Sequence, residues 1–420
     1  MNTKTYQSEK GQAIIYLVLG LVVFLGFVAL AIDGGMALAD RRHSQNAADA
    51  ASLAGGGEAA LYLEQAPNLC YATWQCGDSI AIHAINLAED SSISRAAENN
   101  FDIIDTTVAT DHNWVMASCE AVPYTGYVDK YIDVTVDISS TVQSNFAQVL
   151  FPKDLSNVVD AVTRVRPSQP VALGNAIVAL NPAGCSGHTN GIIVSGDGDT
   201  WVEGGGIFSN GCLRGNGTFT TTITGGALPV GHELIPGDLD NWNPDPQETP
   251  LYLNSSDFGI PVPNCSHPDA HNVTANHLPD DLEPGLWCIS GNVKLTGSHG
   301  TLHGEGVTLV ILDGVFDAAG GADVTLSGLD ATYPALPGIV IYLPESNTNT
   351  VTLNGNSSSY YAGLVYAPKS LIKMDGTGDV MYMQSQVIGW NVTVGGTADT
   401  KVVYDACLGY NRPPSIELSK

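Results

Sequence analysis

The chain has 420 residues, and its 16 Lys and Arg against 43 Asp and Glu give it a formal net charge of −27 at pH 7. A surface this acidic repels phosphate, which argues against nucleic acid as a partner. Charged residues make up only 14% of the chain, while 46 Gly and 22 Pro favour short strands joined by tight turns.

The first feature along the chain is an uncharged apolar stretch over residues 13–32. As a helix rising about 1.5 Å per residue it would span roughly 30 Å, the thickness of a bilayer's hydrocarbon core. A cleaved secretory signal is the alternative, with Lys4 and Lys10 at its start and Ala29 to Ala31 as its cleavage pattern. The stretch is longer than the usual signal core of about 7–15 residues. We therefore expect a retained transmembrane helix over residues 13–32, after a short N-terminal segment at residues 1–12.

The cysteines decide the expected orientation, because all of them follow the apolar stretch. An even number of cysteines in an exported chain is typical of disulfides in an oxidising compartment. Sequence does not reveal their pairing, although Cys70 and Cys76 are close enough to close a small loop. We expect a single-pass membrane protein with a cytosolic N-terminus and an extracytoplasmic bulk. The eight cysteines are Cys70, Cys76, Cys119, Cys185, Cys212, Cys265, Cys288 and Cys407.

The next region, residues 33–165, is predicted to be a small α+β domain on the membrane helix. An alanine-rich segment continues the helix, and a second helix is expected over residues 79–99 because its apolar side chains recur at helical spacing. Apolar and polar residues then alternate over residues 131–138, which indicates a strand. A short helical piece at residues 146–150 and a further strand at residues 158–165 complete the domain. A proline-bounded hinge follows at residues 166–170.

Beyond the hinge the pattern changes to short strands separated by Gly, Asn and Asp. Two β-rich regions are predicted, at residues 171–227 and 285–410, with a Pro-, Asp- and Asn-rich excursion of little regular structure at residues 228–284. Short strands at near-regular intervals favour a sandwich, a barrel or a solenoid. We expect an all-β, right-handed β-helix or solenoid-like domain, because no long helix interrupts residues 285–405. Residues 411–420 are predicted to be a tail.

Four stretches near the N-terminus resemble the signature of TadG-like proteins of tight-adherence (Tad, or Flp) pilus systems. They are residues 9–13, 31–35, 40–42 and 45–55, and together they make the resemblance dense over residues 9–55. Residues 134–165 are similar to the pilin-like ectodomain that often follows, and residues 306–311 and 362–368 resemble more loosely a glycine-rich β region of some members. The motif positions are Gly11, Gln12, Asp33, Gly34, Asp40, Arg41, Arg42, Gln45, Ala48, Asp49, Ala50, Ala51, Leu53, Ala54 and Gly55.

The resemblance implies a bacterial cytoplasmic-membrane protein that helps to assemble, anchor or decorate an adhesive pilus, without enzymatic activity or a cofactor. The expected partners are the lipid bilayer and other pilus-assembly membrane proteins or pilin-like helices, which Gly20 and Gly26 would allow to approach closely. Pilins are cut after a Gly and carry a Glu five residues beyond the cut. Cutting after Gly11 would place Tyr16 there. An accessory protein therefore fits better than a fibre subunit.

Candidate metal sites are sparse. Asp197, Asp199 and Glu203 lie in a Gly-rich turn where carboxylates and carbonyls would suit Ca²⁺, although such turns are more often only solvated. The stretch from Asp137 to Thr141 is close to the D-x-S-x-S metal motif of von Willebrand A domains, but an exposed strand end explains it better. Three histidines also share one polar loop, where a proline argues against a helical metal pair. They are His267, His271 and His277.

Two other classes of function remain open. Aromatic side chains on a β face would stack on sugars in an adhesin or carbohydrate-binding module, which makes a cell-envelope glycan an alternative partner. A polysaccharide-active β-helix enzyme would need converging carboxylates, which spacing cannot show. The aromatic candidates are Trp201, Trp242, Trp287, Trp390, Tyr360 and Tyr361, and the carboxylates are Asp238, Asp240, Asp245, Asp313 and Asp317.

Overall fold

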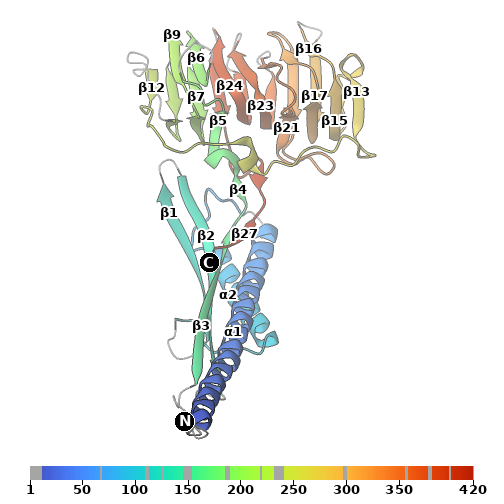
Figure 1. Ribbon diagram of the computed structural model, residues 1–420. Coiled ribbons are helices and arrows are strands. Elements are labelled where there is room, and N and C mark those ends of the chain that lie inside the picture. Colours follow the sequence, from blue (N-terminus) through green and yellow to red (C-terminus); the bar gives the residue numbers. More distant parts are fainter. Residues whose placement is uncertain are drawn as a thin grey trace, which may run out of the picture.

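The protein is elongated, with a long helix at one end and a broad parallel-sheet domain at the other (Figure 1). Its computed structural model describes residues 12–66, 69–108, 113–124, 127–144, 154–184, 190–217, 220–230, 241–296, 300–354, 358–376, 381–396 and 399–419. Between the two ends lies a small antiparallel sheet packed against the helix (Figure 1). The predicted layout, a long apolar helix followed by a mostly β chain, is confirmed.

A single helix, α1 (Gln12–Gln65), runs through the whole N-terminal region without a break. It contains no Pro, and alanine and leucine, both strong helix formers, are frequent in it. Side chains from Ile14 to Leu30 are mostly exposed, whereas from Asp33 onward one side of the helix becomes buried. The helix therefore has an uncovered apolar half and a packed half.

The packed half of α1 belongs to a small α+β domain, here called the ectodomain after its expected location, that also contains α2 (Ser79–Glu98) and the strands β1 (Trp114–Tyr124), β2 (Tyr127–Val142) and β3 (Leu155–Arg166). The alternation predicted for residues 131–138 falls within β2, where Ile132, Val134, Val136 and Ile138 are all buried in the core shared with the two helices. The helical piece predicted at residues 146–150 lies outside the described residues.

The C-terminal segment returns to this ectodomain instead of ending as a tail. Strand β27 (Ser415–Leu418) pairs antiparallel with β3, so the sheet order is β1-β2-β3-β27. Strand β26 (Asn411–Arg412) pairs with β4 (Gln169–Pro170) just before it. The segment predicted as a tail thus completes the sheet, and everything between β4 and β26 is an insertion in the ectodomain.

The insertion is a domain of short parallel strands, here called the parallel-sheet domain (residues 175–403). Each strand pairs in parallel with one a few strands further along the chain, as β15 does with β18 and β18 with β21. The strands are β5 (Asn175–Ala179), β6 (Ile192–Gly196), β7 (Thr200–Glu203), β8 (Gly206–Ser209), β9 (Leu213–Gly217), β10 (Thr221–Ile223), β11 (Ala227–Pro229), β12 (Trp242–Asn243), β13 (His271–Thr274), β14 (Asp281–Leu282), β15 (Gly285–Ser290), β16 (Val293–Leu295), β17 (Thr301–Glu305), β18 (Val307–Ile311), β19 (Phe316–Ala318), β20 (Asp323–Ser327), β21 (Ile339–Tyr342), β22 (Val351–Leu353), β23 (Tyr360–Gly376), β24 (Met381–Gly396) and β25 (Thr400–Val403).

The order of these strands in space differs from their order along the chain. Strands β5 to β12 extend to one side of β24, and the chain then crosses to the far end, where β13 begins (Figure 1). Strands β13 to β23 return toward the middle, and β24 closes the domain by pairing with β23 on one side and with β5 and β6 on the other. The last long strand is therefore the centre of the domain.

The parallel-sheet domain has two apolar layers. Inward-facing side chains such as Ile177, Val194 and Leu309 fill the space between the coiled strands. A second cluster lies where the excursion packs against an outer face, with Leu253 and Phe258 near strand residues such as Phe208. The predicted excursion thus contains short elements and covers the sheet. Its 3-10 turns are η4 (Ser255–Phe258) and η5 (Ala275–His277), and η2 (Val171–Gly174) lies at the hinge.

The expected disulfides are present, but the small loop between Cys70 and Cys76 is not. Cys70 instead pairs with Cys407, 337 residues away, and Cys76 pairs with Cys119. A third bond joins Cys265 to Cys288. Cys212 is disulfide-bonded as well, and Cys185 lies outside the described residues.

Candidate functional site: the membrane helix and the domain junction

The first half of α1 is suited to lie in a membrane. Its most apolar window is 0% buried, and it is a helix long and apolar enough to cross a bilayer. Large side chains such as Leu17, Phe24 and Leu30 are each more than 60% exposed. Water would not favour such a surface, whereas lipid would cover it.

The second half of α1 is attached to the sheet by polar residues of the TadG-like signature. Asp33 is buried at 3% exposure and accepts a hydrogen bond of 2.9 Å from the Ser144 hydroxyl. Asp40 accepts hydrogen bonds from the Ser140 hydroxyl and from the Asn157 amide, the latter at 2.9 Å. These contacts hold the start of the packed half of α1 in register with β2 and β3.

Further along the helix, Gln45 makes a similar contact. Its amide donates to the Asp49 carboxylate at 2.8 Å and to the Asp160 carbonyl oxygen at 3.2 Å. Asp49 is thereby held against the helix surface, and the Asp160 contact adds another tie to β3. The polar signature positions thus act as a series of attachments between helix and sheet.

The small residues of the signature permit close packing. Ala48 and Ala51 are fully buried. A Cβ on Gly55 would lie 2.2 Å from the Ser92 Oγ and 2.5 Å from the Ala88 carbonyl oxygen, so only glycine allows α2 to come this close. Sequence reasoning missed the matching face of α2, although its signal was present as Ala81, Ala84, Ala88, Ser92 and Ala96 at helical spacing.

The remaining signature positions are less buried. Arg41, Arg42 and Leu53 are exposed, and Gly34, Ala50 and Ala54 are half-buried. Gly11 lies outside the described residues, and Gln12 begins α1. The signature is therefore mainly a packing surface between α1, α2 and the sheet.

The structure does not assemble the predicted metal candidates into a ligand set. Asp199 accepts hydrogen bonds from the Thr220 amide at 2.9 Å and hydroxyl at 2.6 Å, which lower the pKa of its carboxyl. Glu203 forms an ion pair of 2.9 Å with Lys401. Within the described ranges, no three His, Cys, Asp or Glu side chains converge as metal ligands. The calcium site at Asp197, Asp199 and Glu203 remains a prediction.

The three loop histidines are used separately. His267 packs edge-on against Tyr333, His271 stacks on Trp287 at 4.2 Å between ring centroids, and His277 lies 2.7 Å from the Thr274 hydroxyl.

Of the aromatic candidates for sugar stacking, Trp242, Trp287 and Tyr361 are buried and belong to the core. Trp201, Tyr360 and Trp390 are half-exposed, and Lys369 lies over the Trp390 ring. Among the candidate carboxylates, Asp313 accepts the Gly291 amide at 2.7 Å, and Asp238 and Asp240 fall outside the described residues.

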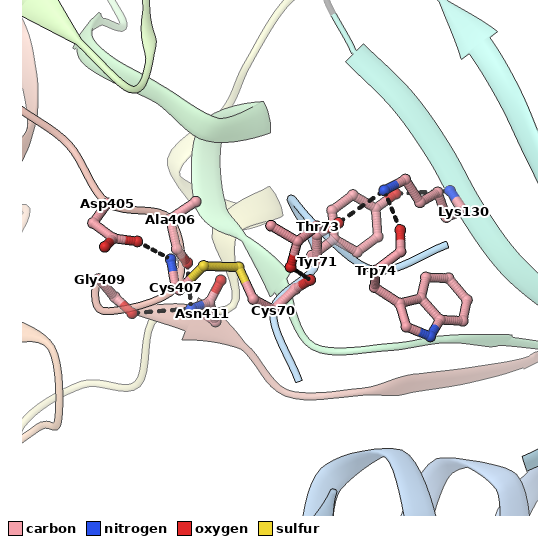
Figure 2. Close-up of a disulfide and its surroundings, with 10 residues drawn as sticks. All are labelled: Cys70, Tyr71, Thr73, Trp74, Lys130, Asp405, Ala406, Cys407, Gly409 and Asn411. Atoms are coloured by element: carbon pink, nitrogen blue, oxygen red, sulfur yellow. Dashed lines mark hydrogen bonds between the residues drawn. A yellow bond between two sulfur atoms is a disulfide. The ribbon is translucent and has the colours of Figure 1, made fainter. Parts of the chain in front are cut away.

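The ectodomain and the parallel-sheet domain meet at a junction made by two crossing segments and a disulfide. The two crossing segments pair with each other as the antiparallel strands β4 and β26, and the Arg412 guanidinium donates to the Gln169 side-chain oxygen at 2.6 Å. The Cys70–Cys407 bond lies beside them and ties the segment after α1 to the segment before β26 (Figure 2).

Next to this disulfide, Lys130 of β2 is held by the segment that follows Cys70. Its ammonium donates to the carbonyl oxygens of Tyr71 at 2.9 Å and of Trp74 at 2.5 Å (Figure 2). The Tyr71 hydroxyl accepts the Lys130 amide and donates to the Val128 carbonyl oxygen, both at 2.7 Å. Burial raises the pKa of Tyr71 to about 12, so this hydroxyl stays protonated.

A cavity of about 290 Å³ lies at this junction. Its walls come from the ectodomain, including Tyr71, Tyr127 and Asp129, and from the hinge and parallel-sheet domain, including Leu173 and Gly204. Both domains are therefore needed to form it.

Comparison with known proteins bears on the N-terminal part. A family model described as putative Flp pilus-assembly TadE/G-like matches residues 11–60. Neither the search of curated proteins nor that of solved structures found a match. The matched residues include the buried polar and small positions that join α1 to α2 and the sheet. The resemblance over residues 9–55 is thus confirmed, and the chain carries a TadE/G-like segment at its N-terminus.

Proposed function

We propose that this protein is a non-enzymatic, single-pass membrane protein that assists assembly, anchoring or decoration of a bacterial Tad-type adhesive pilus. The observation that carries the proposal is the continuity of α1, whose uncovered apolar half leads without a break into the half that forms the ectodomain core. The TadE/G-like match covers both halves. The N-terminus would lie in the cytosol and the rest outside, where the disulfides are stable.

In this proposal α1 is both anchor and support. A helix that continues from lipid into a folded core has no flexible linker between membrane and ectodomain. Asp33 and Asp40 tie it to the sheet near the expected membrane boundary. The parallel-sheet domain would then be held at a defined distance from the bilayer, where it meets pilus subunits or other assembly proteins.

We also propose that the parallel-sheet domain is a right-handed β-helix. Its strands pair in parallel between successive passes of the chain, as β17 does with β20. Parallel strands joined by crossovers in one sheet are right-handed in nearly all proteins.

A matched pair of α1 variants tests the anchor. Val22 is 60% exposed within the apolar half, and Leu61 is 52% exposed within the extracytoplasmic half. Val22→Arg would place a charge at the bilayer centre at a cost of about 2.5–3.5 kcal/mol, so membrane retention of the full chain should fall. Leu61→Arg adds the same charge to the same helix outside lipid, and retention should be unchanged. Equal retention of both variants would refute the membrane helix.

Topology and pilus assembly need separate measurements. An alkaline phosphatase fused after residue 420 should be active, because that enzyme requires an oxidising compartment. Cells lacking the gene should show fewer pili and weaker surface attachment, and the parent gene should restore both. Unchanged pilus number and attachment would refute the assembly role while leaving the membrane anchor intact.

A further inference from the structure

The cavity at the domain junction has a chemistry that the pilus role does not use. We propose that it binds a neutral sugar unit, a mono- or disaccharide portion of an envelope or surface glycan. The cavity measures about 290 Å³, at the small end of the size range of small-molecule sites. Such sites occur preferentially where domains meet, and well-packed interiors rarely leave voids much larger than a water molecule.

The walls combine aromatic rings with hydrogen-bonding groups. Tyr71 and Tyr127 both line the cavity, and Asp129 and Gln169 lie with them in its wall. The C–H faces of a sugar ring pack on aromatic rings, while its hydroxyls require donors and acceptors at the edge. A purely apolar ligand would leave those polar groups without water, so a ligand rich in hydroxyls fits better.

The charged residues of the wall already have hydrogen-bond partners within the protein. The Asp129 carboxylate accepts hydrogen bonds from the Nε and Nη2 atoms of Arg166, each at 3.2 Å. The Lys130 ammonium is held by the Tyr71 and Trp74 carbonyl oxygens. Arg166 also pairs with Glu417 at 2.7 Å, so the two cations and the two carboxylates of this group balance, and an ionised ligand would find no net countercharge to compensate its desolvation. The site selects a neutral ligand.

The backbone beside the cavity is held in an unusual conformation. Ala172 and Leu173 have φ values of 51° and 59°, in the left-handed region that side chains with a Cβ rarely adopt, and Leu173 lines the cavity. Residues in such conformations are strained and tend to cluster at ligand sites. Elsewhere in the wall, a Cβ on Gly204 would lie 2.0 Å from the Tyr404 carbonyl oxygen, so this close approach requires glycine.

The nearby disulfide fixes the spacing of the walls. Cys70 directly precedes Tyr71, and Cys407 directly follows Ala406, which lines the cavity from the segment between the parallel-sheet domain and β26. The bond therefore joins the two walls of the cavity, and Figure 2 shows it between Ala406 and Tyr71. A site held open before the ligand arrives loses less conformational freedom on binding.

The test uses the full chain in lipid nanodiscs free of glycolipids and glycosidic detergents, because both would compete. Saturation-transfer NMR and calorimetry measure binding of N-acetylglucosamine, N,N′-diacetylchitobiose and maltose, with glucuronic acid as the charged comparison. We expect saturable millimolar or tighter binding of at least one neutral sugar, and weaker binding of glucuronic acid.

Two variants locate the site. Tyr127→Ala removes one ring from the wall and should weaken binding about five- to tenfold. Tyr252→Ala removes a tyrosine that is 49% exposed and outside the lining, and it should leave binding unchanged. Circular dichroism and formation of the Cys70–Cys407 bond check that each variant is folded. Absence of saturable binding by every neutral sugar, or equal binding by the two variants, would overturn the proposal.

Discussion

Two neighbouring glycines of α1 give a sharp test of how closely the helix packs on the sheet. A Cβ at Gly56 would lie 2.4 Å from the Thr163 Cγ2 of β3, whereas at Gly57 it would meet nothing within 4 Å. Thr163 cannot simply turn away, because its hydroxyl donates to the Ser52 Oγ at 3.0 Å and the side chain is fully buried. The same substitution, Gly→Ala, thus has two different surroundings in one helix.

The magnitudes follow from two effects. Replacing a helix-interior Gly by Ala favours the helix by about 0.5–1 kcal/mol at either position. Inserting a methyl group into a filled contact costs typically about 1–3 kcal/mol. Gly57→Ala should therefore stabilise the ectodomain slightly, and Gly56→Ala should destabilise it by up to about 2 kcal/mol. Because the helix term cancels, the difference between the two variants isolates the packing term.

Hydrogen exchange measured by mass spectrometry on the full chain in nanodiscs gives the opening free energy of the α1 and β3 peptides. We expect protection to decrease in Gly56→Ala and to hold or increase in Gly57→Ala. Equal protection in the two variants would mean that α1 does not approach β3 as closely as the structure has it, and the account of close packing between this helix and the sheet would fail.

Three further predictions concern the disulfide, the pH dependence and the last strand. Replacing Cys70 and Cys407 together by Ala should lower the free energy of unfolding by up to about 5–6 kcal/mol, the loop-entropy value for their 337-residue separation, as measured by denaturant titration. Burial raises the pKa of Glu89, so between the ordinary carboxylate pKa and this raised pKa the native state holds a proton that the unfolded state has lost. The free energy of unfolding therefore falls as pH rises through this interval. Glu89→Gln should therefore be more stable than the parent near neutral pH, with the gain vanishing below the ordinary carboxylate pKa. Deleting residues 413–420 removes β27. Hydrogen exchange along β3 should then become faster, because the lost backbone pairing lowers the opening free energy of β3 by roughly 2–5 kcal/mol.

Local patterns in the sequence were enough to predict the elements that depend on local properties. Length and hydropathy predicted the membrane segment of α1, and alternation predicted the part of β2 whose Ile132, Val134 and Val136 face the core. The even number of cysteines, all after the apolar stretch, predicted that they would be bonded. In each case one periodicity or one composition rule carries the information.

Contacts between distant segments were not predictable in this way. Nothing near Cys70 indicates that its partner is Cys407, and a strand of the length of β27 has too few residues to show which sheet it joins. The position of β24 between β23 and β5 likewise depends on where the whole excursion leads the chain. The junction cavity was missed for the same reason, because its walls come from segments that the sequence separates widely.

The insertion of the parallel-sheet domain between β3 and β27 has a mechanical consequence. Two chain segments connect the ectodomain to the inserted domain, one leaving the end of β3 and the other entering the start of β27. These two strand ends lie side by side, since Arg166 pairs with Ser415, and β3 is also paired along its length with β2. A pull on the parallel-sheet domain would therefore load β3 and β27 along their strand direction, where many backbone hydrogen bonds resist together instead of one after another. The Cys70–Cys407 bond adds a second path, from the segment before β26 to the segment that follows α1. Force on the outer domain would thus reach α1 through covalent and hydrogen-bonded routes in parallel, an arrangement that suits the anchoring role proposed above.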